Sequence, residues 1–224
     1  MKILEKIKKE VDRSTAKILD RLFKTTKFDS YQRKYSNIFE NNYKFNKNQF
    51  SFVHPPRTGG TSVHGLLLKN NKKDFYAGVH SAVSLLCNPK EFKYIAAIRE
   101  PIERVYSFYL VQKQFKKLPF HVHAKKGLEF FLQNAWSSRN GICKFINGNI
   151  ETEVNEELYK ISVENMKNFY FILDLKHLER DTNMLLSKLN IKNKKIEHEN
   201  SYLTTKDSLS NQNKELIKKY NLYD

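Results

Sequence analysis

The segment from residue 50 to residue 69 constrains the fold more than any other part of the chain. Phe50, Phe52 and Val53 form a short apolar run that is typical of a buried strand. Two prolines and a Thr-Gly-Gly-Thr turn follow, and residues 62–69 then place apolar side chains at helical spacing. A strand, a glycine-rich turn and a helix in this order form the first half of an α/β unit.

The pattern further along extends this unit into a complete domain. Residues 94–98 and 169–173 are apolar runs of strand length, and Pro101 stands at the favoured first position of a helix. Because strands alternate with helices, we predict an α/β fold with a doubly wound, mainly parallel sheet flanked by helices. Helices are expected at residues 62–69, 102–116, 156–167, 175–189 and 206–222, with one or two short helices within 126–147.

The chain divides into an N-terminal arm, residues 1–48, and a domain, residues 49–224. Apolar side chains recur at helical spacing over residues 1–24, which indicates a basic amphipathic helix, whereas residues 25–48 are polar and rich in Asn and Lys. We expect the helix to pack on its own domain. A membrane-surface anchor and a partner-binding helix are the alternatives, and the first of these would give the protein a peripheral membrane contact.

Composition narrows the setting and the partners. Lys and Arg outnumber Asp and Glu by 40 to 24, so the net charge is +16. This charge favours polyanionic partners, but it also fits a lysine-rich surface without a specific role. No run of 18 apolar residues occurs, and Cys87 and Cys143 form no CxxC motif. We expect a cytoplasmic protein with buried free thiols and no specific contact with nucleic acid, membrane-associated if its N-terminal helix binds lipid.

The turn at residues 54–62, His-Pro-Pro-Arg-Thr-Gly-Gly-Thr-Ser, is suited to holding a phosphate. Gly59 and Gly60 allow the backbone to approach a ligand closely, and the following helix directs its first amides at the turn. Further donors are the side chains of Arg57, Thr58, Thr61 and Ser62. The GxxxxGK[ST] signature of ATP and GTP hydrolases is absent, and the second strand ends in Arg99 rather than in an acid. A P-loop-like cradle without a metal is therefore predicted, with an ordinary capped glycine turn as the alternative.

A second anion site is predicted where the next helix begins. Arg99 stands at the carboxyl end of the second strand, the edge at which open α/β sheets bind ligands. Ser107 lies about two turns into the following helix. One guanidinium and one hydroxyl make a clamp for a phosphate. The alternative is a surface ion pair of Arg99 with Glu100 or Glu103, beside a solvated serine.

Together, the two segments resemble the PAPS-dependent sulfotransferases, most closely the carbohydrate branch that includes the heparan sulfate 2-O and 6-O enzymes. PPRTGGTS, residues 55–62, is similar to that branch's PKTGGTS loop for the donor's 5′-phosphosulfate. IREPIERVYSFY, residues 98–109, is similar to its RxPxxRxxSxY motif for the 3′-phosphate. Weaker likenesses at residues 140–148, 171–185 and 220–224 extend the resemblance over the domain. It implies transfer of a sulfuryl group from PAPS to a carbohydrate hydroxyl, on an acidic or lipid-linked glycan among others, with PAP as product and no metal.

The resemblance also implies a base and a residue that covers the donor. The family's base follows the first helix in a GxHA-like context, which Gly-Val-His-Ser-Ala at residues 78–82 matches, so His80 is the predicted base and a capping or partly buried structural role is the alternative. Lys206 lies in a late loop of the kind that closes over the donor, where it would meet a phosphate, and a solvated loop residue is the alternative. Arg57 replaces the family's usual Lys. Because Arg does not release its proton, we expect Arg57 to stabilise charge rather than to act as an acid.

Residues 116–126 contain four Lys and two His, and we expect them to form a flexible loop. The pair of His121 and His123 has no further ligand pattern that would support a metal site. The loop's positive charge allows contact with an acidic acceptor.

Three other functions stay open. A nucleotide kinase or NTPase on a similar sheet would bind ATP with Mg²⁺. A non-catalytic polyanion-binding protein would owe its affinity to the net charge, and that affinity would fall steeply with salt. A degenerate sulfotransferase would bind the donor without turnover, and Arg57 in place of Lys leaves room for it.

Overall fold

The computed structural model describes residues 48–70, 75–76, 82–83, 88–150, 152–192 and 209–224. The predictions for the N-terminal helix and arm, for the base His80, for Cys87 and for Lys206 concern residues outside these ranges. Among the described residues, no helix is long and apolar enough to cross a membrane.

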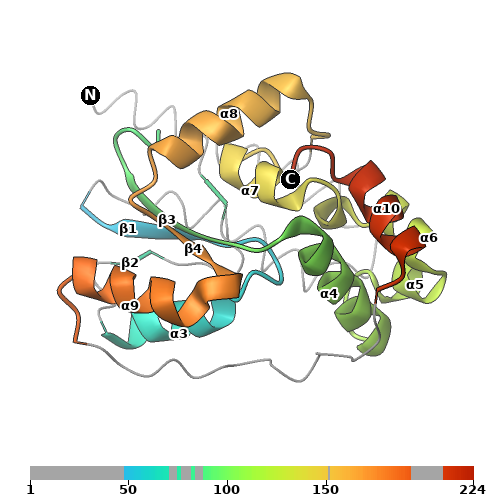
Figure 1. Ribbon diagram of the computed structural model, residues 1–224, viewed down its shortest axis with the longest axis horizontal. Coiled ribbons are helices and arrows are strands. Elements are labelled where there is room, and N and C mark those ends of the chain that lie inside the picture. Colours follow the sequence, from blue (N-terminus) through green and yellow to red (C-terminus); the bar gives the residue numbers. More distant parts are fainter. Residues whose placement is uncertain (1–47, 71–74, 77–81, 84–87, 151, 193–208) are drawn as a thin grey trace, which may run out of the picture.

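A parallel sheet with the strand order β2-β1-β3-β4 forms the centre of the domain (Figure 1). Its longer strands are β1 (Phe50–Val53), β3 (Lys93–Ile98) and β4 (Phe171–Asp174), and β2 (Phe75–Tyr76) adds two residues beside β1. All three strand pairings are parallel. The predicted α/β class with a parallel sheet and flanking helices is confirmed.

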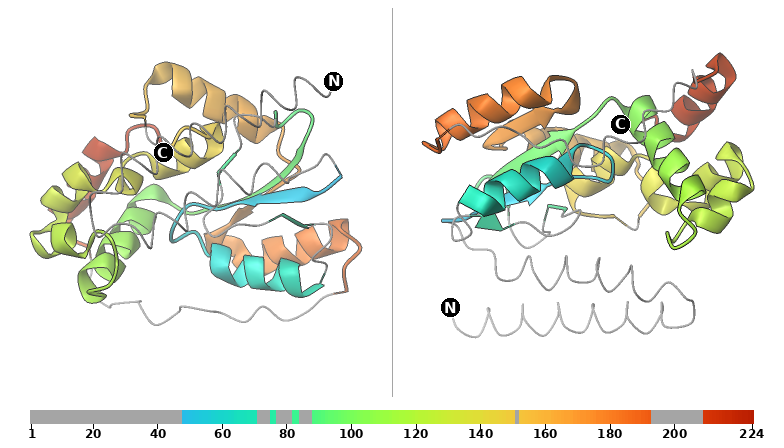
Figure 2. Two further views of the ribbon diagram at one scale, coloured as in Figure 1. Left: turned by 180° about the vertical axis from the view of Figure 1, so that it is seen from behind. Right: turned by 90° about the horizontal axis from the view of Figure 1, so that it is seen from below.

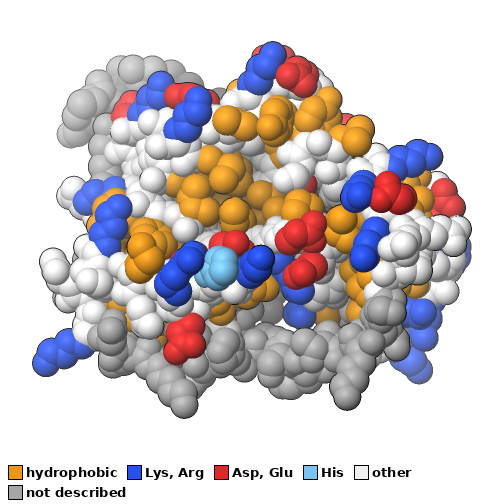
Figure 3. All heavy atoms as spheres, viewed as in Figure 1, with side chains coloured by type: hydrophobic (Ala, Val, Ile, Leu, Met, Phe, Trp, Pro, Cys, Tyr) orange, Lys and Arg blue, Asp and Glu red, His pale blue; other side chains and the backbone are white. Residues whose placement is uncertain are grey.

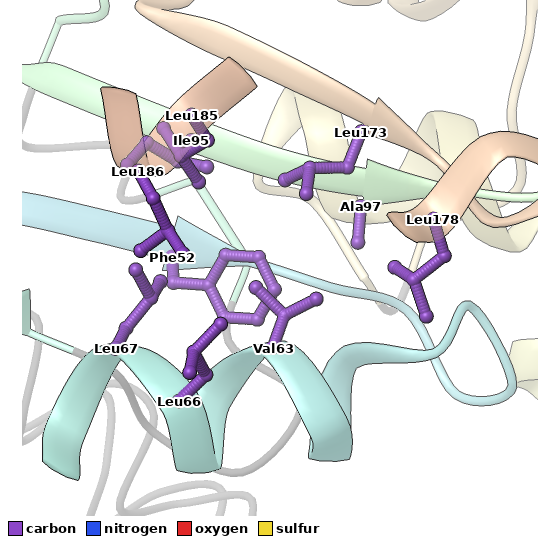
Figure 4. Packing of buried hydrophobic residues seen from close by; sticks show 10 residues of the cluster. All are labelled: Phe52, Val63, Leu66, Leu67, Ile95, Ala97, Leu173, Leu178, Leu185 and Leu186. Carbon is purple, nitrogen blue, oxygen red and sulfur yellow. The ribbon is translucent and has the colours of Figure 1, made fainter. Parts of the chain in front are cut away.

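One face of the sheet packs against α3 (Gly60–Asn70) and α9 (Leu178–Lys188). Phe52 from β1, Ile95 from β3 and Leu173 from β4 are fully buried there, between apolar side chains of both helices (Figure 4). Alternate residues of a strand point to one face, so these three side chains form one continuous apolar layer. Removing this layer from water is a large part of what stabilises the fold.

The opposite face packs against α7 (Gly141–Asn147), and α8 (Glu156–Lys167) lies on α7. Tyr94 of β3 and Phe145 of α7 are fully buried on this side. Because β3 is covered on both faces, residues 94–97 are all buried and show no alternation of apolar and polar side chains.

A second group of helices lies beyond the carboxyl ends of the strands (Figures 1 and 2). Its core contains Phe108, Phe120 and Phe131, whose rings meet edge to face at centroid distances of 5.4 to 6.4 Å. Such ring contacts add to the stabilisation that burial provides. The helices are α4 (Pro101–Gln114), α5 (His121–Lys125), α6 (Leu128–Asn134) and α10 (Asn211–Tyr220).

Most predicted elements are present with shifted ends. The helix at residues 156–167 has the predicted bounds, and α4 begins at Pro101. The helix expected at residues 175–189 is divided into the 3₁₀ turn η2 (Leu175–His177) and α9. α10 begins after Ser210, whose hydroxyl accepts a hydrogen bond from the Asn213 amide at 3.2 Å. β2 was not predicted, because two residues give no periodic signal.

The expectation of a flexible loop with exposed histidines at residues 116–126 is wrong. The segment turns back on α4 and forms α5. The amide of Phe120 donates to the side chain of Gln112 at 3.0 Å, and His121 Nδ1 lies 3.0 Å from the Gln112 carbonyl oxygen. Phe120 and Ala124 are buried in the core of the second helix group, so burial fixes a segment whose polar residues indicated a loop.

A buried ion pair ties Asp224 to the second helix group. The Arg104 guanidinium lies 3.2 Å from the Asp224 carboxylate, and both side chains are fully buried. Arg104 also donates to the Ser137 carbonyl at 3.2 Å, and the carboxylate accepts from the amides of Ile142 and Cys143 at the start of α7. Burial lowers the pKa of Arg104, and the charge of Asp224 opposes that effect. The pair is therefore well hydrogen-bonded but costly to leave half complete.

Replacing Asp224 with Asn is expected to lower the free energy of unfolding by about 3–5 kcal/mol, because the charge of Arg104 would remain buried without a counterion. Urea denaturation followed by circular dichroism measures the change. Glu215→Gln is the control, because it removes an exposed carboxylate paired with Lys218 at 2.7 Å and is expected to cost at most about 1 kcal/mol. Equal losses in the two variants would contradict a structural role for the buried pair.

Candidate functional site

The strand order makes the loops that follow β1 and β3 diverge from each other. These two strands are neighbours. The chain leaves β1 toward β2 on one side and leaves β3 toward β4 on the other. Loops that diverge in this way open a crevice at the carboxyl edge of a parallel sheet, where α/β proteins bind ligands. We call the region between residues 54–59, after β1, and residues 99–100, after β3, the crevice.

The turn after β1 is too closely packed to admit side chains at its two glycines. A Cβ atom at Gly60 would collide with the ring of His54, which is buried and stacks on Phe52. Gly59 has a φ of 77°, and a Cβ atom there would press on Leu175 of η2. The need for both glycines is thus partly structural, because the buried ring of His54 and the side chain of Leu175 fill the space beside them.

Arg57 adopts a backbone conformation that is uncommon for a residue with a side chain. Its φ is 71°, in the left-handed region. Thr58, the next residue, is fully buried, and its hydroxyl donates to the Pro55 carbonyl at 2.8 Å. The left-handed backbone of Arg57 and the fixed position of Thr58 together set the direction in which the Arg57 side chain leaves the turn. Strain of this kind is concentrated at functional sites in proteins.

One hydrogen bond joins the two segments that the sequence singled out. Arg57 Nε donates to Ser107 Oγ at 3.0 Å, although the two residues are 50 positions apart. Arg57 is half-buried, and Ser107 is buried on α4. The structure therefore brings the turn after β1 and the first half of α4 into direct contact. The sequence predicts that Ser107 and Arg99 together hold a phosphate, whereas in the structure the Ser107 hydroxyl accepts a hydrogen bond from Arg57.

The crevice carries positive charge that no carboxylate of the described residues neutralises at Arg57. Burial lowers the pKa of Arg57, and the nearby charge of Arg99 lowers it further. Arg57 stays protonated at neutral pH, because the guanidinium pKa begins far above 7. Two like charges on partly buried side chains favour an anion between them, and the negative charge of such an anion would raise the pKa of Arg57.

Arg99 forms the surface ion pair that was the alternative to a phosphate clamp. Its guanidinium lies 3.3 Å from Glu103, whose side chain is 65% exposed. Glu100 caps α4, because its carboxylate accepts from the Glu103 amide at 2.7 Å. An exposed pair of this kind contributes little free energy, so a phosphate could displace it.

The start of α3 supplies the remaining donors. The helix begins at Gly60 and has no acidic residue in its first turn. Amides in the first turn of a helix lack carbonyl partners within the helix, and the helix dipole adds partial positive charge there. Thr61 is exposed at this end and Ser62 is buried. The N-terminus of α3 and Arg57 thus belong to the same turn.

Two contributions to the site were not predicted. Arg104 was quoted in the second motif without a role, and the structure uses it to hold α4 through Asp224. Leu175 and Leu178 lie against Gly59, so the segment after β4 supports the turn after β1. Long-range contacts of this kind leave no local signal in a sequence. The described residues contain no group of three His, Cys, Asp or Glu that could hold a metal ion.

No protein-family model matches this chain, and no curated protein matches it either. Two observations bear on the function: the chemistry of the crevice and the resemblance of its two motifs to those of the PAPS-dependent sulfotransferases.

The crevice is expected to bind pyrophosphate, and Arg57→Gln is expected to weaken that binding by about 10- to 100-fold, because hydrogen bonds to charged groups contribute about 1.5–3 kcal/mol. Isothermal calorimetry measures the affinity. Lys188→Gln is the control: it removes the same charge next to Tyr170, at the opposite edge of the sheet. Equal affinities of the two variants would show that Arg57 is not a ligand of the anion.

Proposed function

We propose that the protein is a sulfotransferase that transfers a sulfuryl group from PAPS to a hydroxyl of a carbohydrate. The hydrogen bond from Arg57 to Ser107 is the observation that supports this most strongly. It unites the two segments that resemble the donor-binding motifs of the carbohydrate sulfotransferases. A glycine turn with an unrelated role would give no reason for this contact.

The residues of the crevice suit the two ends of the donor. In this proposal the 5′-phosphosulfate lies on the P-loop-like turn, held by Arg57 and by the backbone of residues 58–62. The 3′-phosphate lies near Arg99 and Ser107 on α4. Lys206 closes over the donor. The sheet of the proposed enzyme is doubly wound, with the donor at its switch point.

The protein's own groups would act by position and charge. PAPS supplies an activated sulfuryl group, and its transfer resembles phosphoryl transfer, in which electrostatic stabilisation dominates. Arg57 stabilises the negative charge that develops on the departing phosphate. Its permanent positive charge suits this task, whereas a proton donor would need a group of lower pKa. His80 accepts the proton of the acceptor hydroxyl as it attacks.

The same residues argue against a metal-dependent kinase. Thr61 stands before Ser62, at the position where the kinase signature has a lysine. β3 ends at Ile98, and Arg99 follows where an NTPase needs an acid for Mg²⁺. A positive charge at that position repels a metal ion and attracts a phosphate.

Calorimetric titration tests the donor site. Selective binding of PAP over ATP with Mg²⁺, weakened about tenfold or more by Arg99→Ala, is the expected result, because a charged hydrogen bond to the 3′-phosphate is lost. Equal affinities for the two nucleotides, or a preference for ATP with Mg²⁺, would refute the sulfotransferase proposal and favour the kinase.

His80→Ala tests the base. Transfer of radiolabelled sulfuryl groups to a panel of neutral and acidic oligosaccharides is expected to fall by about 10²–10⁴-fold, while PAP affinity stays unchanged. His123→Ala is the matched control, since it removes an imidazole from α5, outside both loops of the crevice. Turnover that is equal in the two variants would remove His80 from the mechanism without touching the donor site.

A further inference from the structure

The corner between α4 and α5, residues 113–126, carries a concentrated positive charge. It contains five lysines and no acidic residue. In the structure all five lysines are exposed. Figure 3, in the orientation of Figure 1, shows basic side chains at the lower right edge, over the region of α5. The lysines of this corner are Lys113, Lys116, Lys117, Lys125 and Lys126.

This charge is not neutralised from within the part of the chain that the structure describes. None of the described acidic side chains forms an ion pair with a lysine of the corner. Glu100 and Glu103 lie at the other end of α4, roughly 15–20 Å away along the helix. Glu129 on α6 is the next acid along the chain, and Glu215 on α10 is paired with Lys218. With respect to the described acidic residues, the positive charges of the corner are thus unneutralised.

Two large apolar side chains stand among these lysines. Phe115 is 45% exposed and Val122 is 64% exposed. The backbone that carries them is fixed: Leu118 N–H donates to the Phe115 carbonyl at 3.0 Å, and Gln112 anchors the start of α5. A fixed, strongly basic corner that also exposes apolar side chains is suited to a partner that has both negative charge and an apolar part.

We propose that this corner binds the surface of an anionic membrane, with the lysines at lipid phosphates and with Phe115 and Val122 inserted among the headgroups. Basic side chains that surround exposed aromatic and aliphatic residues are the chemistry of interfacial membrane binding. A soluble acidic glycan would be recognised by the lysines, but it offers nothing apolar to Phe115 and Val122. The inference does not depend on sulfuryl transfer.

The position of the corner would bring the crevice close to the membrane. Ser107 lies on α4 and Phe115 directly follows the last residue of this helix, eight positions later, which corresponds to about 12 Å along the helix axis. A lipid headgroup of a membrane bound at the corner would therefore be able to reach the crevice. If the proposed function holds, the acceptors would include the sugar of a lipid-linked glycan.

Vesicle co-sedimentation of the full chain tests the surface. The probes are vesicles of phosphatidylcholine alone and of phosphatidylcholine with 30% phosphatidylglycerol. The double substitution Lys116→Gln, Lys117→Gln is expected to weaken binding to the anionic vesicles by about 30-fold, since each lysine near such a surface contributes roughly fivefold. The control is Lys160→Gln, Lys167→Gln, which lowers the net charge equally on α8. It is expected to leave binding nearly unchanged.

A second variant separates a membrane from a soluble polyanion. Phe115→Ser with Val122→Ser is expected to weaken vesicle binding at least tenfold and to leave dextran sulfate binding unchanged. If this variant binds vesicles like the unmodified protein, or if the two lysine variants bind vesicles equally, the proposal is overturned. Loss of dextran sulfate binding alone in the Lys116, Lys117 variant would point to an acidic glycan instead. PAP affinity, measured on the same variants, reports on the donor site separately.

Discussion

The buried contact between Arg104 and Asp224 is the constraint on which the geometry of the crevice depends. It holds α4 against the start of α7, because one carboxylate receives the guanidinium and two amides of that helix. Ser107 follows Arg104 by three residues, so the two side chains lie on neighbouring faces of the same turns of α4. A helix fixed by Arg104 on its buried side can hold the Ser107 hydroxyl at 3.0 Å from Arg57. One buried ion pair thereby sets the distance between two segments that are far apart in the sequence.

The three arginines of this region are neutralised to different extents, and that difference gives the crevice its character. Among the described residues, Arg104 has a buried carboxylate as its partner, Arg99 has an exposed carboxylate, and Arg57 has only a hydroxyl. Charge that is half-buried is screened by salt much less than charge on the surface. An anion at Arg57 would therefore be held by a local field, whereas the lysines of the corner between α4 and α5 would act through a long-range field that salt weakens. The positive charges of the chain thus differ in how strongly salt screens them.

Local patterns predicted the elements that position the crevice, but not the contacts that assemble it. The apolar run at β3, the proline at the start of α4 and the paired glycines before α3 each follow from a local rule, and the structure has all three. The contact of Arg104 with Asp224 spans 120 residues, and no periodicity signals it. The lysines and histidines of the α5 segment predict a loop, because two core residues among them, Phe120 and Ala124, give no periodic apolar pattern. Burial decided that conformation, and burial depends on the tertiary structure.

Arg57 joins backbone strain, burial and charge in one residue, and the three together favour a fixed electrostatic role. A φ of 71° costs free energy that a flexible surface arginine would avoid. The hydrogen bond to Ser107 and the packing of Thr58 then hold the guanidinium in one orientation. A charge that is fixed before the ligand arrives needs no reorganisation when negative charge develops, which is the basis of electrostatic catalysis. Lysine, with a flexible stem and a pKa that burial shifts more readily, would combine charge with proton donation. An arginine at this position keeps both its proton and its charge, so in the proposed sulfuryl transfer the turn after β1 would act on the departing phosphate through its field alone.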